Sequence, residues 1–189
     1  MTDLDTTLFL WLNAPAHPSA ATLGVAVFLA KYLVVSLPLG WIIGWFRGST
    51  HTRRTLLFVA VAAAGAIAMS GLIGHIAPQP RPFVLGLGHR LIEHEADASF
   101  PSDHLTLWWT VAVALWARGA TRIGLTLGLL GLTMAWARIY VGVHFPIDMV
   151  GAMGVAALAV SAARLTQRVW LGGLTRRIIA VQRRLLPGH

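Results

Sequence analysis

Three short polar segments of the chain gather the side chains best suited to chemistry on a phosphate group. These side chains are Arg81 in "PQPRPF", Ser102 and His104 in "FPSDH", and Arg138, His144 and Asp148 in "ARIYVGVHFPID". The guanidinium of arginine is always charged and carries forked donors that match phosphate oxygens. A histidine with an aspartate four residues later can be held through one ring nitrogen while the other acts as nucleophile or base. The three segments therefore predict one site that binds phosphate and attacks it.

The position of each residue within its segment predicts its role. Ser102 follows a proline at an expected helix start, where it can act as N-cap and leave backbone N–H groups facing an anion. Pro146 suits the first turn of a helix, so His144 precedes that helix and Asp148 lies in its opening turn. His104, on a different helix, is then available to protonate a leaving oxygen. We predict catalytic roles for the two histidines and the aspartate, and phosphate-binding roles for Ser102 and the two arginines.

The sequence around these segments is that of a membrane protein. Of its 189 residues, 56% are hydrophobic and 12% are charged, whereas soluble domains have roughly 45–50% apolar and 25% charged residues. No internal repeat or linker divides the chain. We therefore predict an all-α, polytopic membrane helix bundle that forms a single domain over residues 1–189.

Five stretches resemble membrane spans, each of which needs about 20 mostly apolar residues. They cover residues 20–45, 55–77, 105–117, 123–143 and 147–163. The third is short, and reaches spanning length only if its helix begins near Ser102. Residues 8–14 are too few to cross and predict an interfacial helix, and the basic C-terminal tail predicts an amphipathic helix lying against anionic lipid.

Charged residues divide unequally between the two ends of these spans. With successive loops on alternate sides, the loops at 47–54 and 118–122 and the tail from Arg164 onward share one side and carry most of the basic residues. All acidic residues fall on the other side with three arginines, Arg81, Arg90 and Arg138. By the positive-inside rule the basic side is cytoplasmic. The site is therefore expected to face the periplasm or the cell exterior from the plasma or inner membrane.

Two classes of protein are disfavoured by composition. The formal charge of +8 comes from short basic clusters between apolar runs, which act as topology signals, so nucleic acid is not an expected partner. The chain has no cysteine, which rules out disulfides, thiolate nucleophiles and cysteine-based metal sites.

The three polar segments resemble the signature of the type 2 phosphatidic acid phosphatase superfamily. That signature reads Lys-x6-Arg-Pro, then Pro-Ser-Gly-His, then Ser-Arg-x5-His-x3-Asp. The matching residues are Arg81-Pro82, Pro101-Ser102-Asp103-His104, and Arg138, His144 and Asp148, in family order. Within the superfamily, the segments look most like the bacitracin-resistance type of undecaprenyl pyrophosphate phosphatase.

The resemblance implies a metal-free reaction without a cofactor. His144 would attack phosphorus to form a phosphohistidine, Asp148 would orient it, and His104 would protonate the departing group. Arg81, Ser102 and Arg138 would hold the phosphoryl oxygens. The favoured substrate is a polyprenyl diphosphate, undecaprenyl diphosphate, converted to undecaprenyl phosphate at the outer leaflet.

This chain departs from the family pattern at three positions. Gly74 stands where the family has lysine, Asp103 replaces the glycine of the second motif, and Ala137 replaces the serine of the third. The first change removes a cationic phosphate contact. Lys31, within the first span, could supply that cation, and the acidic loop at 93–97 could gate substrate or bind a divalent ion near a diphosphate.

Other functions remain open at this point. The same chemistry could act on another lipid phosphate, such as phosphatidate, phosphatidylglycerophosphate or a lipid A phosphate. His104, His144 and Asp148 could instead form a two-histidine, one-carboxylate metal set, although two neighbouring arginines favour an anion. A transporter or scaffold could bind a phosphorylated lipid without turnover. Neither the lipid chain length nor the oligomeric state follows from the sequence.

Overall fold

The computed structural model describes residues 3–185, with side chains through residue 181. Its described residues form helices and loops without a strand. The helices are α1 (Asp3–Leu12), α2 (Ala20–Val27), the π-helix η1 (Phe28–Tyr32), the 3₁₀-helix η2 (Leu33–Val35), α3 (Ser36–Arg47), α4 (Thr50–Ile76), the 3₁₀-helix η3 (Pro82–Leu85), α5 (Asp103–Ala117), α6 (Thr121–Tyr140) and α7 (Pro146–Leu185). The all-α bundle predicted from the sequence is confirmed.

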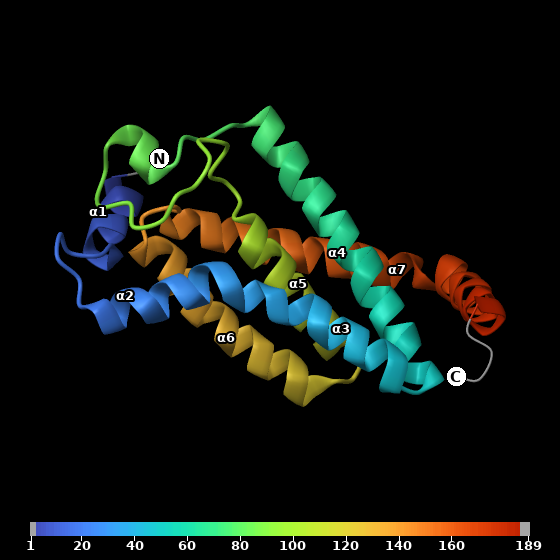
Figure 1. The fold of residues 1–189 in the computed structure, drawn as a ribbon. Coiled ribbons are helices and arrows are strands. Elements are labelled where there is room, and N and C mark those ends of the chain that lie inside the picture. Colours follow the sequence, from blue (N-terminus) through green and yellow to red (C-terminus); the bar gives the residue numbers. More distant parts are fainter. Residues whose placement is uncertain (1–2, 186–189) are drawn as a thin grey trace.

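Four helical segments are long and apolar enough to cross a membrane. They are Ala20–Arg47, Thr50–Ile76, Thr121–Tyr140 and Pro146–Val181. The remaining predicted span, residues 105–117, corresponds to α5. This helix has 15 residues and packs against α4, α6 and α7 in the middle of the bundle (Figure 1). Because its neighbours surround it, α5 buries large side chains such as Leu105 and Trp108 completely. The chain is a multi-pass membrane protein.

Two tryptophans fasten α5 to α6. The indole N–H of Trp108 donates to the Leu127 carbonyl at 2.7 Å, and that of Trp109 donates to the Gly128 carbonyl at 3.3 Å. Both indoles are buried. A buried indole N–H needs an acceptor, so these bonds fix the register between the two helices.

The first span is not the single regular helix that its apolar run predicts. Its α-helical hydrogen bonding is interrupted after Val27 by η1 and then by η2 before α3 resumes. A π-turn shifts the pattern of backbone bonding and leaves carbonyls available to other groups, and such turns recur at functional sites. The Ala30 carbonyl in η1 accepts a hydrogen bond from Arg138 of α6 at 2.9 Å.

Helix α1 lies across one end of the bundle, beginning earlier than the 8–14 stretch predicted for it (Figure 1). Phe9 is completely buried and its ring packs on Phe145 with centroids 5.2 Å apart, whereas Trp11 is 81% exposed. Asp5 Oδ1 accepts from the Ile147 backbone N–H at 3.0 Å. Helix α1 thus satisfies one of the free donors at the start of α7.

The predicted basic tail is helical and continuous with the last span as α7. Its residues beyond the predicted end at 163 pack back on α4, where Trp170 stacks on Phe58 at 6.3 Å and Leu171 is buried. The last turns, red in Figure 1, run in a different direction from the orange part of the helix. The basic side chains of Arg183 and Arg184 lie outside the described side chains.

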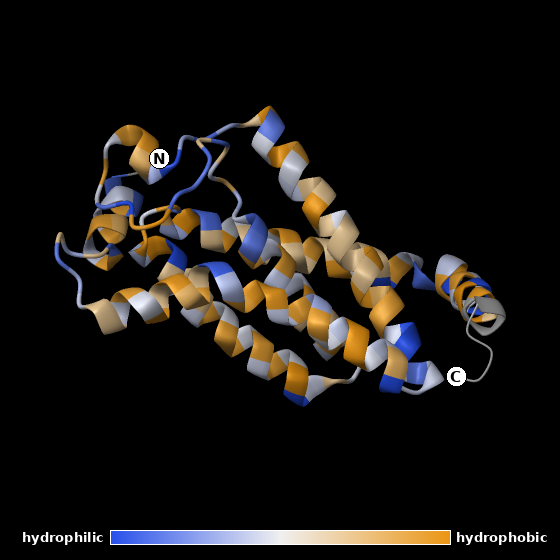
Figure 2. Ribbon diagram, in the orientation of Figure 1, coloured by the Kyte–Doolittle hydropathy of each residue, from blue (hydrophilic) through white to orange (hydrophobic). Residues whose placement is uncertain are grey.

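Polar residues gather at the two ends of the bundle, with apolar helix between them (Figure 2). One end carries α1, the long connection from 77 to 102, and the turn between α6 and α7. The other end carries the short connections after α3 and α5 and the end of α7. This arrangement places all three chemistry-bearing segments at the same end.

Candidate active site

The site forms where the start of α5, the end of α6 and the start of α7 meet the 77–102 connection. Five of the six predicted site residues are buried there: Arg81, Ser102, Arg138, His144 and Asp148. The sixth, His104, lies on the first turn of α5 and is partly exposed. Residues separated by more than 60 positions in the sequence are thus brought together, as the prediction of a single site from the three segments requires.

Asp148 holds one side of the His144 ring. The His144 Nδ1 to Asp148 Oδ2 distance is 3.0 Å, and the same oxygen accepts from the Phe145 backbone N–H at 2.8 Å and from the Ser99 hydroxyl. Because an ionised carboxylate is only an acceptor, Nδ1 carries the proton in this contact. The other ring nitrogen, Nε2, is then the unprotonated one.

Two guanidinium groups face that free nitrogen. Arg81 Nη1 and Arg138 Nη2 each lie 3.0 Å from His144 Nε2. A guanidinium has donors and no acceptor, so both contacts require a lone pair on Nε2. The nitrogen that would attack phosphorus therefore lies between the two groups that would bind the phosphoryl oxygens.

Backbone carbonyls fix the two guanidinium groups. Arg81 donates through Nη1 to the Val143 carbonyl at 3.0 Å and through Nη2 to the Ala98 carbonyl at 3.1 Å. Arg138 donates through Nη1 to the Ala30 carbonyl described above. Because three of the four terminal nitrogens donate to backbone carbonyls and the fourth, Arg138 Nη2, contacts His144, the cationic groups are pre-positioned before any ligand arrives.

The acidic loop supplies two further contacts. Arg81 Nε donates to Asp97 Oδ1 at 2.8 Å, and Arg138 Nη2 donates to His94 Nε2 at 3.1 Å. The Asp97 side chain is 53% exposed and that of His94 is 20% exposed. The loop thus closes over the arginines and lies within reach of solvent, where an incoming phosphate would meet it.

Burial and the arginines set the charge of the site. Burial lowers the pKa of His144 well below its usual value, and the charges of Arg138 and Arg81 lower it further. Burial also lowers the pKa of His94, again reinforced by Arg81. Burial alone would raise the pKa of Asp97, but the hydrogen bond and charge of Arg81 outweigh it and lower that pKa. His144 is therefore a neutral base and Asp97 an anion at neutral pH.

The start of α5 brings Ser102 and His104 to the site. Ser102 occupies the predicted N-cap position, but its side chain makes no capping bond, and its buried hydroxyl has no hydrogen-bond partner within the described part of the chain. Its backbone N–H donates to the Asp148 carbonyl at 3.4 Å. His104 is close enough for its charge to lower the pKa of His144. A free hydroxyl and a partly exposed histidine thus accompany the nucleophile.

The structure explains two of the three departures from the family pattern, those at Asp103 and Gly74. Asp103 Oδ1 accepts from the buried Ser70 hydroxyl at 2.6 Å, which ties α4 to the start of α5. At Gly74 a Cβ atom would lie 3.3 Å from the Ala98 Cβ, so the loop packs closely where a lysine would stand. Lys31 is exposed, and its Nζ lies 5.7 Å from the Tyr32 ring centroid. Nothing in the structure explains Ala137 in place of serine.

Sequence reasoning missed several members of this site. Ser99 holds Asp148, and the carbonyls of Ala30, Ala98 and Val143 hold the arginines. Ser99 lies close before the Pro-Ser-Asp-His segment and could have been noticed there. The three carbonyls could not have been predicted, because every residue has a backbone carbonyl whatever its side chain. Among the described residues, no cluster of three or more histidine, aspartate or glutamate side chains could hold a metal ion.

Comparison with known proteins agrees with these motifs. The PAP2 superfamily model matches residues 54–170, which include every predicted site residue. The chain belongs to the PAP2 superfamily. The expected family is thereby confirmed, and only the Ala30 carbonyl of the described site lies outside the matched residues.

Relatives of similar length include two bacterial proteins named as undecaprenyl-diphosphatases. "Putative undecaprenyl-diphosphatase YbjG" of Escherichia coli is 36% identical over 151 residues, covering 80% of this chain and 76% of the relative. "Undecaprenyl-diphosphatase BcrC" of Bacillus subtilis is 33% identical over 151 residues, covering 80% and 78%. The predicted likeness to the bacitracin-resistance type is confirmed.

Two solved structures share the fold. LpxE of Aquifex aeolicus has a TM-score of 0.69 at 24% identity, covering 86% of this chain and 95% of that protein. A PAP2-type phosphatidylglycerolphosphate phosphatase of Bacillus subtilis has a TM-score of 0.58 at 18% identity, covering 89% of each. At these identities the similarity concerns the helix arrangement.

Proposed function

We propose that this protein is a membrane phosphatase that hydrolyses undecaprenyl diphosphate to undecaprenyl phosphate and inorganic phosphate. The observation that carries the proposal is the position of His144 Nε2, 3.0 Å from a guanidinium nitrogen of both Arg81 and Arg138, with Nδ1 held by Asp148. A neutral nitrogen between two phosphate-binding cations is suited to attack on phosphorus. The names of the relatives support the choice of lipid.

The reaction divides into two transfers. In the first, the Nε2 lone pair forms a bond to the terminal phosphorus, the bond from phosphorus to the bridging oxygen breaks, and His104 gives its proton to that oxygen. In the second, His104 accepts a proton from water, whose oxygen displaces the histidine from phosphorus. Asp148 stabilises the positive charge that develops on the His144 ring.

The two arginines and the Ser102 hydroxyl would hold the phosphoryl oxygens throughout. Guanidinium groups provide the charge stabilisation for which other phosphatases use a metal ion. We therefore expect turnover to survive thorough chelation. A loss of activity on chelation that a divalent ion restores would contradict the proposal that the two arginines and Ser102 alone hold the phosphoryl group.

The proposed location is the plasma or inner membrane, with the site facing the periplasm or cell exterior. The positive-inside rule supports this orientation, because basic loops lie at the end opposite the site. Thr50→Cys and Glu95→Cys place single thiols at exposed positions of the two ends in a chain without cysteine. An impermeant thiol reagent applied to spheroplasts should label position 95 and spare position 50. The reverse pattern would overturn the orientation.

A panel of lipids tests the substrate. Purified protein is given undecaprenyl diphosphate, phosphatidate, phosphatidylglycerophosphate and a lipid A phosphate at equal mole fraction in the same detergent. We expect the highest kcat/KM for the undecaprenyl lipid. Faster turnover of another lipid would change the substrate and keep the mechanism, and binding without phosphate release from any lipid would replace the enzyme by a binding protein.

A further inference from the structure

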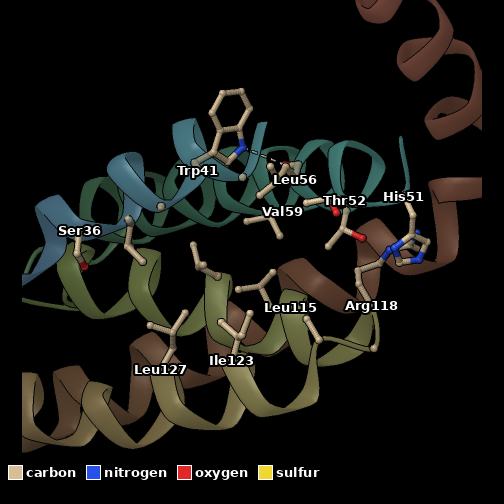
Figure 3. Close-up of a pocket in the computed structure, with 17 residues that line it drawn as sticks. Ser36, Trp41, His51, Thr52, Leu56, Val59, Leu115, Arg118, Ile123 and Leu127 are labelled. Carbon is tan, nitrogen blue, oxygen red and sulfur yellow. Dashed lines mark hydrogen bonds between the residues drawn. The ribbon is translucent and has the colours of Figure 1, made fainter. Parts of the chain in front are cut away.

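A cavity lies toward the end of the bundle opposite the site. Its volume is about 740 Å³, and it is enclosed by α3, α4, α5 and α6 (Figure 3). That size lies within the roughly 300–1,000 Å³ of typical small-molecule sites. None of the six predicted site residues lines it.

The first span opens the cavity by diverging from α6. Helix η1 packs on α6 near the site, whereas α3 packs on α4 further along the bundle. Ser36, Gly40 and Gly44, spaced four residues apart on α3, all line the cavity. Since a Cβ at Gly40 would meet no atom within 4 Å, side chains do not fill the space at that point.

The walls are mostly apolar, but two polar atoms along them are unsatisfied. Thr55 is 6% exposed, and its hydroxyl has no hydrogen-bond partner within the described residues. The same holds for the buried Nε of Arg118, whose Nη1 donates to Gln167 at 3.0 Å. Both residues line the cavity. Buried polar atoms without partners are costly, so the pair points to a ligand that brings acceptors.

The charge around the cavity mouth has one sign. His51 and Arg118 lie together at the mouth in Figure 3. Further basic side chains occur on the same two connections: Arg47, Arg53, Arg54 and Arg122. All seven acidic residues of the chain belong to segments at the other end: Asp3, Asp5, Glu93, Glu95, Asp97, Asp103 and Asp148. An anionic group is therefore the complement of this mouth.

We propose that this cavity binds an anionic membrane phospholipid from the leaflet opposite the site. One acyl chain fills the apolar space between α3 and α6, and the phosphate head group lies at His51 and Arg118. The bilayer supplies such a lipid directly, because two of the helices that bound the cavity, α3 and α6, lie on the outside of the bundle. The bound chain occupies the open space beside Gly40.

Native mass spectrometry of the purified full chain tests the proposal without measuring activity, so its outcome is independent of the proposed phosphatase. The probes are phosphatidylglycerol and phosphatidylcholine with identical acyl chains. The wild type should retain one phosphatidylglycerol, with about fivefold preference over phosphatidylcholine from a single basic side chain. Equal retention of the two lipids would overturn the anionic head-group site.

Two leucine substitutions test the location. Gly40→Leu fills the cavity and should abolish retention of phosphatidylglycerol. Gly24→Leu is the matched control, because a Cβ there also meets no atom within 4 Å and Gly24 does not line the cavity. Both changes replace a poor helix former by a good one, so neither should unfold its helix. Equal retention in the two variants would overturn the assignment.

The head-group contact is tested separately by Arg118→Gln. This variant should bind phosphatidylglycerol and phosphatidylcholine equally while keeping the acyl-chain space. Thr55→Val removes only the unpartnered hydroxyl. It should weaken retention of phosphatidylglycerol, but by less than Arg118→Gln does. Displacement of phosphatidylglycerol by undecaprenyl phosphate that depends on Gly40 would instead assign the cavity to the polyprenyl product of the reaction and overturn the proposal.

Discussion

The two ends of the bundle solve opposite packing problems. At the site, the two guanidinium groups and the His144 ring are held by backbone carbonyls, a carboxylate and one another, while the buried Ser102 hydroxyl and Arg138 Nε have no partner within the described residues. At the other end, α3 and α6 leave an apolar cavity with unsatisfied polar atoms at its wall. The charged groups of the first end are thus held in place before a ligand binds, whereas the second end leaves an apolar space open.

This difference follows from what encloses each end. The site is enclosed by a long connection and by α1, whose backbone and side chains reach into the gaps between helix ends. The opposite end has only short turns, from 47 to 50 and from 117 to 121, which are too short to cover a gap between diverging helices. Loop length at the two ends therefore decides which space the protein fills and which space lipid must fill.

The largest expected effect separates the two histidines of the site. His144→Ala should lower phosphate release by at least about 1,000-fold, the scale seen when an enzyme loses its nucleophile. It should also form no phosphoenzyme, whereas His104→Ala should still be phosphorylated by an aryl phosphate whose leaving group needs no proton. Rapid quenching at alkaline pH followed by peptide mapping measures this. Phosphate found on His104 would reverse the roles.

A smaller effect should appear in the pH dependence of stability. Burial holds the pKa of His144 in the folded protein well below the ordinary histidine value, so the unfolded chain alone takes up this proton as pH falls below about 6.5. His94 adds to the loss because its pKa is lowered in the same direction. Each histidine then costs up to about 1.4 kcal/mol of unfolding free energy per pH unit.

Thermal unfolding in detergent between pH 7 and pH 5 measures this contribution. The unfolding temperature of the wild type should fall more steeply than that of His144→Gln, which has no imidazole at the site. The Gly40→Leu variant, altered only at the opposite end, should parallel the wild type. Parallel curves for wild type and His144→Gln would show that the histidine is not held neutral by the fold.

The smallest expected effect concerns the cation missing at Gly74. The Lys31 side chain is exposed, and it is the carbonyl of its neighbour Ala30 that contacts Arg138. Lys31→Met should therefore leave kcat/KM within about twofold of the wild type, as for a surface change away from the site. A loss comparable to that of an arginine variant would mean that this ammonium reaches the phosphate.

Much of the fold followed from local sequence patterns. Apolar runs located the spans, and α4 ended one residue from its predicted limit at 77 but began at Thr50, five residues before the predicted start at 55. Pro146 was predicted to lie in the first turn of α7, and it does. Ser102 was predicted to be the N-cap residue of α5, and it occupies that position. Such features depend on neighbouring residues only, since helix starts and hydrophobic length are properties of a short segment.

The site residues also followed from the sequence, but their connections did not. Their residue types, order and spacing marked Arg81, His144 and Asp148, because charged groups in an apolar chain are costly unless they are used. Which nitrogen of His144 is free depends on contacts from three separate elements. The roles of the Ala30 carbonyl and of Ser99 depend on the same packing.

The sequence by itself determined the helical class, the membrane character, the family and the set of candidate site residues. Only the tertiary structure decided the π-turn in the first span, the central place of α5, the continuation of α7 beyond residue 163 and the cavity beside Gly40. The physical reason is that composition and spacing act locally along the chain. Backbone carbonyls and gaps between helices acquire partners only when distant segments pack together.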